Sequence, residues 1–226
     1  MDPGAIVARQ RRDSEIEFDE VIDRRRTSRE WTDREVDFEA IKRIIGAGMK
    51  APSWDHCRSW QFIVLHTKEE KGHAFSFAKS VARKFDPTRY EGRTLNLSQE
   101  MYLYAMPRQH TMLIDCPYVI VPLFPCKRLN AEWVSKLNPL ATAWCVAENI
   151  MLAAINEGLG YSLRIPLNRE HDVVLEKLGV PDGWMTPCFI GVGHPKEDER
   201  VLEQYSTDPS GHIRMGGWHI QETVNL

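Results

Sequence analysis

Apolar residues recur every three or four positions between residues 138 and 157, which predicts an amphipathic helix in the protein core. The stripe consists of Leu140, Ala143, Trp144, Ala147, Ile150, Met151, Ala154 and Ile155. Asn138 is expected to cap this helix, and Pro139 is expected to occupy its first turn. A glycine at position 158 or 160 can end it.

A second helix is predicted from Asp37 to Lys50. Its apolar face is formed by Phe38, Ile41, Ile45 and Met49. Asp37 can cap the first turn, and Pro52 ends the helix because proline disfavours helical backbone at the preceding residue. Shorter helices are predicted over Glu17–Arg25 and Arg169–Leu178.

Three apolar runs predict strands, at Trp60–His66, Tyr118–Phe124 and Cys188–Val192. Pro122 lacks a backbone donor, so its strand is expected at a sheet edge or to end early. Helices and strands alternate only loosely, and no G-x-G-x-x-G follows a strand. The predicted fold class is therefore α+β, with a small sheet surrounded by helices.

Length and composition favour a single domain over residues 1–226, with no obvious linker. The net charge of −3 argues against a general binder of nucleic acid or of membrane surfaces. No apolar run reaches the roughly 18 residues of a membrane-spanning helix. The five cysteines are odd in number and widely spaced, as reduced thiols are. We therefore expect a cytoplasmic protein without nucleic-acid or membrane partners.

Three segments give weaker patterns. Residues 1–16 are expected to form a polar N-terminal arm, and residues 68–107 two or three helices. Residues 199–226 are too long for a loose end, and Trp218 and Ile220 suggest that this tail docks on another surface.

The densest cluster of charge is Arg24-Arg25-Arg26-Thr27-Ser28-Arg29, with four guanidinium groups and two hydroxyls in six residues. Guanidinium groups donate paired hydrogen bonds at a fixed angle, and hydroxyls add further donors. This combination suits a phosphate. The alternative for such a run is a solvated basic face.

Two further segments could face the same ligand. In Pro52–Trp60, Trp54 can stack on a planar heterocycle, while His56 and Arg58 can donate to its carbonyl oxygens. The glycine-flanked turn Gly158–Pro166 lets backbone approach a ligand closely, or it simply ends a helix and begins a strand. Histidines and cysteines lack zinc-site spacing, and no G-x-S-x-G occurs, so neither a metal site nor a catalytic residue is predicted.

Taken together, these segments resemble the FMN-dependent nitroreductase family from about Asp19 to Pro195. The pattern R-R-[ST]-x-R-x-[FW]-T stands at Arg25–Thr32, and a helix similar to E-N-x-x-L-A-A-x-x-x-G-L-G ends at Gly160. Many members carry Asn and Gln-Pro where this chain has His56 and Arg58-Ser59. The chain therefore looks like a branch with the form A-P-S-x-D-H-x-R-x-W.

The resemblance implies an intertwined homodimer, a mostly antiparallel sheet and FMN at the subunit interface. Residues implied to hold the FMN phosphate and pyrimidine are Arg25, Arg26, Thr27 and Arg29, and those along the isoalloxazine are Leu163, Arg164 and Ile165. Residues implied to reach the flavin of the other subunit are Pro52, Ser53, Trp54, His56 and Arg58. His212 and Arg214 are assigned to the phosphate by position only.

The implied activity is an FMN-dependent NAD(P)H oxidoreductase. NADH or NADPH would reduce FMN, and a nitroaromatic or quinone acceptor would then take the hydride. Residues 68–107 would cover the substrate, and residues 199–226 would dock on the partner subunit. Two alternatives stay open: another flavin reaction on this fold, such as reductive dehalogenation or flavin fragmentation, and a non-catalytic FMN sensor or store.

Overall fold

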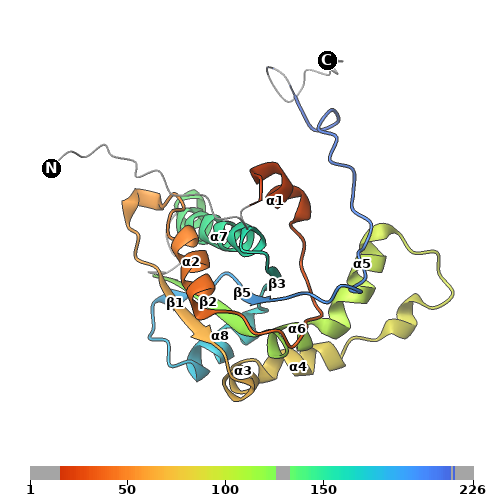
Figure 1. Cartoon of the computed structure of the whole chain (residues 1–226), viewed down its shortest axis with the longest axis horizontal. Helices are drawn as coiled ribbons and strands as arrows, with labels where there is room; N and C mark the ends of the chain where they lie inside the picture. The colour runs from red at the N-terminus through yellow and green to blue at the C-terminus, as the bar shows by residue number, and fades with distance from the viewer. Residues whose placement is uncertain (1–15, 126–132, 215, 217–226) are drawn as a thin grey trace.

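The computed structural model describes residues 16–125, 133–214 and 216, and helices pack on both faces of its antiparallel sheet (Figure 1). The described helices are α1 Phe18–Arg24, α2 Phe38–Gly48, α3 Lys68–Ala74, α4 Ser76–Arg83, α5 Leu97–Ala105, α6 Thr111–Ile114, α7 Trp133–Asn156 and α8 Asn168–Lys177. The short 3-10 turns are η1 Trp54–His56, η2 Pro87–Tyr90 and η3 Met106–Arg108. The strands are β1 Gln61–Leu65, β2 Tyr118–Pro125, β3 Gly160–Arg164, β4 Trp184–Met185 and β5 Phe189–Gly193.

The sheet has the strand order β1-β2-β5-β3, and β4 pairs with the end of β2. Every pairing is antiparallel. The predicted α+β class is thus confirmed, and the predicted strands correspond to β1, β2 and β5. β4 was not predicted, because two residues are too few for an alternating pattern.

Successive side chains of the strands enter two separate cores, as the period of two in a strand requires. Ile120 and Ile190 pack in the core under α2 and α7. Their neighbours Val119 and Phe189 pack in the core under α3, α4, α6 and α8. Figure 1 shows these two groups of helices on opposite sides of the sheet.

Helix α7 begins earlier than predicted, which makes the expected cap at Asn138 wrong. The helix starts at Trp133, and Pro139 lies inside it. Pro139 is the seventh residue of the helix, so it lies beyond the first turn where it was expected, and the helix continues through it with the loss of one intrahelical hydrogen bond. The predicted end is confirmed: Gly158 adopts φ +74°, and the Leu159 amide donates to the Ala154 carbonyl at 2.9 Å.

Strand β2 is central rather than at an edge, so the prediction from Pro122 is also wrong. Pro122 pairs with Phe62 of β1 in the middle of the strand. On its other side, β2 pairs with β5 up to Ile120 and with β4 from Phe124 onward. Pro122 therefore lies where the ladder changes partner, which is a place that tolerates a missing donor.

The two early helices match their predictions and position the arginine cluster. The Asp37 carboxylate caps α2 by accepting from the Glu39 amide at 3.1 Å. Helix α1 ends at Arg24 because Arg25 is extended, with ψ 111°. The chain therefore leaves α1 as an extended segment at the cluster itself.

After β5 the chain runs past α5 and away from the sheet (Figure 1). Residues 203–214 are all exposed. Trp218, Ile220 and the predicted N-terminal arm up to residue 15 lie outside the described residues. None of the described helices is long and apolar enough to cross a membrane.

We expect Gly191→Ala to destabilise the fold by about 1–3 kcal/mol, because the site has no room for a methyl group. A Cβ at Gly191 would lie 2.3 Å from Ser162 Oγ and 2.9 Å from Cys116 Sγ. Gly72, in α3, has no heavy atom within 4 Å of such a Cβ, so Gly72→Ala should stabilise by about 0.5–1 kcal/mol. Urea unfolding of both variants tests this, and equal effects would contradict the packing described.

Candidate functional site

The arginine segment, residues 25–29, is held in place by β3. Thr27 forms a parallel bridge with Tyr161, and the Ser28 amide donates to the Tyr161 carbonyl at 2.7 Å. Ser28 is buried, and the side chains on either side of it point the opposite way. The segment therefore behaves as a short added strand that presents Thr27 and Arg29 on one face.

Arg25 is anchored to the protein by two oxygens. Its Nη1 donates to the Tyr161 hydroxyl at 3.0 Å, and its Nε lies 3.5 Å from Glu148 Oε1 on α7. The Tyr161 hydrogen bond raises the pKa of the Arg25 guanidinium, and burial raises the pKa of Tyr161. Arg25 is therefore a fixed, permanently charged group.

Arg29 and Arg26 carry unused donors. Arg29 Nη1 donates to the Thr27 carbonyl at 3.0 Å, yet its buried Nε has no hydrogen-bond partner among the described residues. Burial lowers the pKa of this guanidinium. The exposed guanidinium of Arg26 has neither a hydrogen-bond nor an ion-pair partner in the described part of the chain. Donors left unpaired in this way are available to an anionic ligand.

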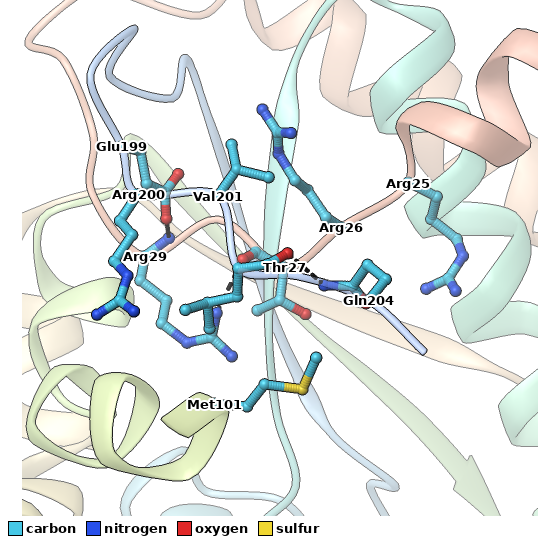
Figure 2. Close-up of a pocket in the computed structure, with 10 residues that line it drawn as sticks. Arg25, Arg26, Thr27, Arg29, Met101, Glu199, Arg200, Val201 and Gln204 are labelled. Carbon is cyan, nitrogen blue, oxygen red and sulfur yellow. Dashed lines mark hydrogen bonds between the residues drawn. The ribbon is translucent and has the colours of Figure 1, made fainter. Parts of the chain in front are cut away.

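A cavity of about 200 Å³ lies between the arginine segment and the chain that follows β5 (Figure 2). Its lining consists of Arg25, Arg26, Thr27, Arg29, Met101, Glu199, Arg200, Val201, Leu202 and Gln204. Four of the predicted ligand residues thus meet in one cavity. We name residues 199–204 the cover strap.

The cover strap brings residues that sequence reasoning missed. Glu199 Oε1 accepts from the Arg29 amide at 2.6 Å, and burial raises the pKa of its carboxyl. Arg200 lines the cavity and lies 3.9 Å from Glu100 of α5. His212 and Arg214 do not line this cavity, and Arg214 Nη1 lies 3.3 Å from the carbonyls of Gly211 and Ile213. From the sequence, Arg200 could have been proposed as a basic residue that soon follows the last predicted strand.

The loop from Pro52 to Arg58 lies elsewhere in the chain, against α7. The Trp54 amide donates to Thr142 Oγ1 of α7 at 2.8 Å, and the indole is 50% exposed. Thr142 is six residues from Glu148, so the two point from faces of α7 about 120° apart. Figure 1 shows the connection from α2 to β1 and helix α1 on different sides of α7. One chain alone does not bring the loop to the arginine segment.

This loop has an unusual backbone conformation. Asp55, His56 and Arg58 have φ values of 51°, 49° and 41°. Such values cost energy in residues other than glycine and are often found in ligand-binding segments. Pro52 and His56 are exposed, and Ser53 is partly buried.

At the end of β3, Leu163 is partly buried and Ile165 is 61% exposed. Arg164 between them is buried, and its guanidinium donates to both Glu170 oxygens at 2.6 and 2.7 Å. The Arg164 side chain therefore points into the protein. Only its backbone could face a ligand on the side of Ile165.

Fold and site together define an α+β protein with a cationic cavity suited to a phosphorylated ligand. In the part of the chain that the structure describes, no group of three or more His, Cys, Asp or Glu side chains could hold a metal ion. A sequence model of the Nitroreductase family matches residues 22–194. The chain belongs to this family.

Individual relatives are distant. A protein of Archaeoglobus fulgidus with the provisional name NADH dehydrogenase/NAD(P)H nitroreductase is 26% identical over 79% of this chain and 86% of its own length. An iodotyrosine deiodinase of Haliscomenobacter hydrossis is 28% identical, over 85% of each chain. An FMN- and NADPH-dependent nitroreductase from Sphigopyxis sp. strain HMH shares the fold with a TM-score of 0.67 at 18% identity, covering 90% of this chain and all of that one.

The raised pKa of Glu199 predicts a pH-dependent effect of Glu199→Gln. The folded state binds the proton more tightly than the unfolded state, so this carboxyl makes the protein less stable as pH rises above its ordinary pKa. Glutamine does not titrate, so Glu199→Gln removes this loss of stability, and its side-chain oxygen can still accept from the Arg29 amide. The melting temperature of Glu199→Gln should therefore exceed that of the wild type by more at about pH 7.5 than at about pH 4.

The control variant is Glu203→Gln, because Glu203 lies on the same cover strap and is exposed. An equal difference in melting temperature at both pH values for Glu199→Gln would show that this carboxyl does not titrate as described.

Proposed function

We propose that this protein is an FMN-dependent NAD(P)H oxidoreductase. The observation that carries the proposal is the cavity at the arginine segment, where neither the Arg26 guanidinium nor the buried Arg29 Nε has a partner among the residues that the structure describes. A phosphate beside a polar aromatic ring system supplies acceptors for both groups. Membership of the Nitroreductase family supports a flavin in this role.

The residues present fit such a cofactor. Arg25, Arg26 and Thr27 would hold the phosphate, and Arg29 would donate to the pyrimidine of the flavin. Arg200 of the cover strap adds a cation that closes the same cavity. The backbone at Leu163–Ile165 would lie along the ring system, because β3 continues directly from the strand position that holds Thr27.

The second half of the site would come from a second copy of the chain. The loop from Pro52 to Arg58 is exposed and lies away from the arginine segment of its own subunit. In a homodimer with FMN at the interface, Trp54 and His56 of this loop would cover the flavin bound by the partner. The tail beyond the cover strap would then dock on that partner.

When bound, FMN supplies the redox chemistry, taking two electrons and a proton from NAD(P)H and passing them to an acceptor. The protein's own residues bind the phosphate, orient the ring and limit access of water. No acid–base pair is needed for this exchange. A nitroaromatic or quinone fits the flat site expected over the ring, and a cytoplasmic location fits the nicotinamide donor.

Reductive dehalogenation is the second candidate. The observation that favours it is the relation to the iodotyrosine deiodinase of Haliscomenobacter hydrossis, at 28% identity. A halogenated phenol would then be the acceptor in place of a quinone. Halide release under reducing conditions distinguishes the two.

We expect the purified protein loaded with FMN to lose its visible flavin absorbance when NADH or NADPH is added without oxygen. Adding a quinone should restore the absorbance, and iodotyrosine should restore it only if dehalogenation is the activity. An FMN-loaded protein that neither nucleotide bleaches would contradict the oxidoreductase proposal and favour a flavin sensor or store.

A further inference from the structure

Arg108 and Gln109, two consecutive residues after α5, contact two walls of the candidate flavin site, the arginine segment and the end of β3. Arg108 Nε donates to Glu30 Oε1 at 2.9 Å, and Glu30 directly follows Arg29. Arg164 Nη1 donates to Gln109 Oε1 at 2.7 Å, and Arg164 directly precedes Ile165. One turn of chain thus contacts the arginine segment on one side and the end of β3 on the other.

The contact with the arginine segment is built around Tyr104 of α5. The Arg108 guanidinium lies 4.1 Å from the centre of the Tyr104 ring, and that of Arg29 lies 5.8 Å from it. The Tyr104 hydroxyl is 3.4 Å from Glu30 Oε1, and Arg108 Nη1 donates to the Tyr104 carbonyl. The Arg108–Glu30 pair is about one-third exposed, so it fixes geometry more than it adds stability.

The contact with β3 is buried. Arg164 and Glu170 side chains are 4% and 0% exposed, and Glu170 Oε2 also accepts from the Leu167 amide at 3.3 Å. This pair therefore holds the turn that carries Ile165. Gln109 gives the guanidinium a third oxygen, which joins the turn to the end of α5.

Helix α5 is itself part of the site, since Met101 lines the cavity and Glu100 lies beside Arg200. Neither Arg108 nor Gln109 lines that cavity. We propose that Arg108 and Gln109 are positioning residues, which hold α5 at a fixed distance from both walls and so determine which acceptors reach the flavin. The proposal rests on the proposed function for its substrate class, a planar quinone-like acceptor.

Two anchors one residue apart restrict α5 more than either alone. A helix held only by Arg108 could still pivot about that contact, and the second contact removes this freedom. By contrast, the preceding turn η2 makes local contacts, such as the Asp86 carboxylate with the Thr88 amide at 3.0 Å. The opening that admits an acceptor should therefore depend on the end of α5 that carries Arg108 and Gln109.

The test compares Gln109→Ala with Gln109→Glu, which keeps oxygen acceptors for Arg164. The first measurement is the ratio of kcat/KM for 1,4-benzoquinone to that for 2-methyl-1,4-naphthoquinone, with whichever nicotinamide bleaches the flavin. Each turnover passes two electrons and one proton from the nicotinamide, with a second proton from water, to the quinone, which leaves as the hydroquinone. We expect Gln109→Ala to change this ratio about tenfold and Gln109→Glu to keep it near the wild-type value.

The second measurement is trypsin cleavage after Arg93, which is exposed before α5. This cleavage assay does not depend on the flavin reaction. We expect Gln109→Ala to raise the cleavage rate about tenfold at an unchanged melting temperature. Arg89→Ala is the control, because Arg89 lies in the same region and pairs only weakly with Asp86 at 3.9 Å. If Gln109→Ala fails to fold, Arg108→Leu provides the same two measurements from the more exposed anchor.

The outcomes separate this inference from the proposed function. If neither nicotinamide bleaches the flavin of the wild-type protein, the proposed function is overturned. The cleavage rates would still report on the anchoring of α5. A bleached flavin with an unchanged quinone ratio in Gln109→Ala overturns the role in acceptor selection. A lower melting temperature with both the ratio and the cleavage rate unchanged leaves Gln109 a purely structural residue and also overturns it.

Discussion

The pairing of the arginine segment with β3 is the interaction on which the candidate site depends. A single hydrogen bond of 2.7 Å from the Ser28 amide to the Tyr161 carbonyl, with the Thr27 bridge beside it, makes residues 25–29 an added strand. Without this pairing, the three arginines of the segment would form a solvated surface, since like charges repel one another. With it, the guanidinium groups of Arg25 and Arg29 take fixed positions and leave donors directed at one cavity.

Strand β3 also connects the other parts of the candidate site. β3 holds the arginine segment at Tyr161, and its other end, at Arg164, is fixed by Glu170 and linked through Gln109 to α5. The cover strap then closes the cavity from the third side through the Glu199 contact with the Arg29 amide. Three segments far apart in the sequence therefore meet at one site beside β3.

Local patterns predicted the parts of the fold that depend on local physics. The face and end of α7 and the Asp37 cap follow from spacing and side-chain type. The start of α7 and the place of Pro122 did not follow, because tertiary packing and a change of strand partner outweighed the local cost of proline. Glu199 and Gln109 join the site through contacts that no sequence pattern encodes, and for Arg200 the sequence offers only a basic residue soon after the last strand.

The most direct measurement of the central claim is the affinity of the protein for FMN relative to riboflavin, which lacks the phosphate. We expect FMN to bind at least about tenfold more tightly, and Arg26→Ala to remove much of this difference while leaving riboflavin binding unchanged. Arg24→Ala, on an arginine outside the cavity, should leave the ratio intact. Equal affinity for the two flavins in the wild type would contradict a phosphate site at the arginine segment.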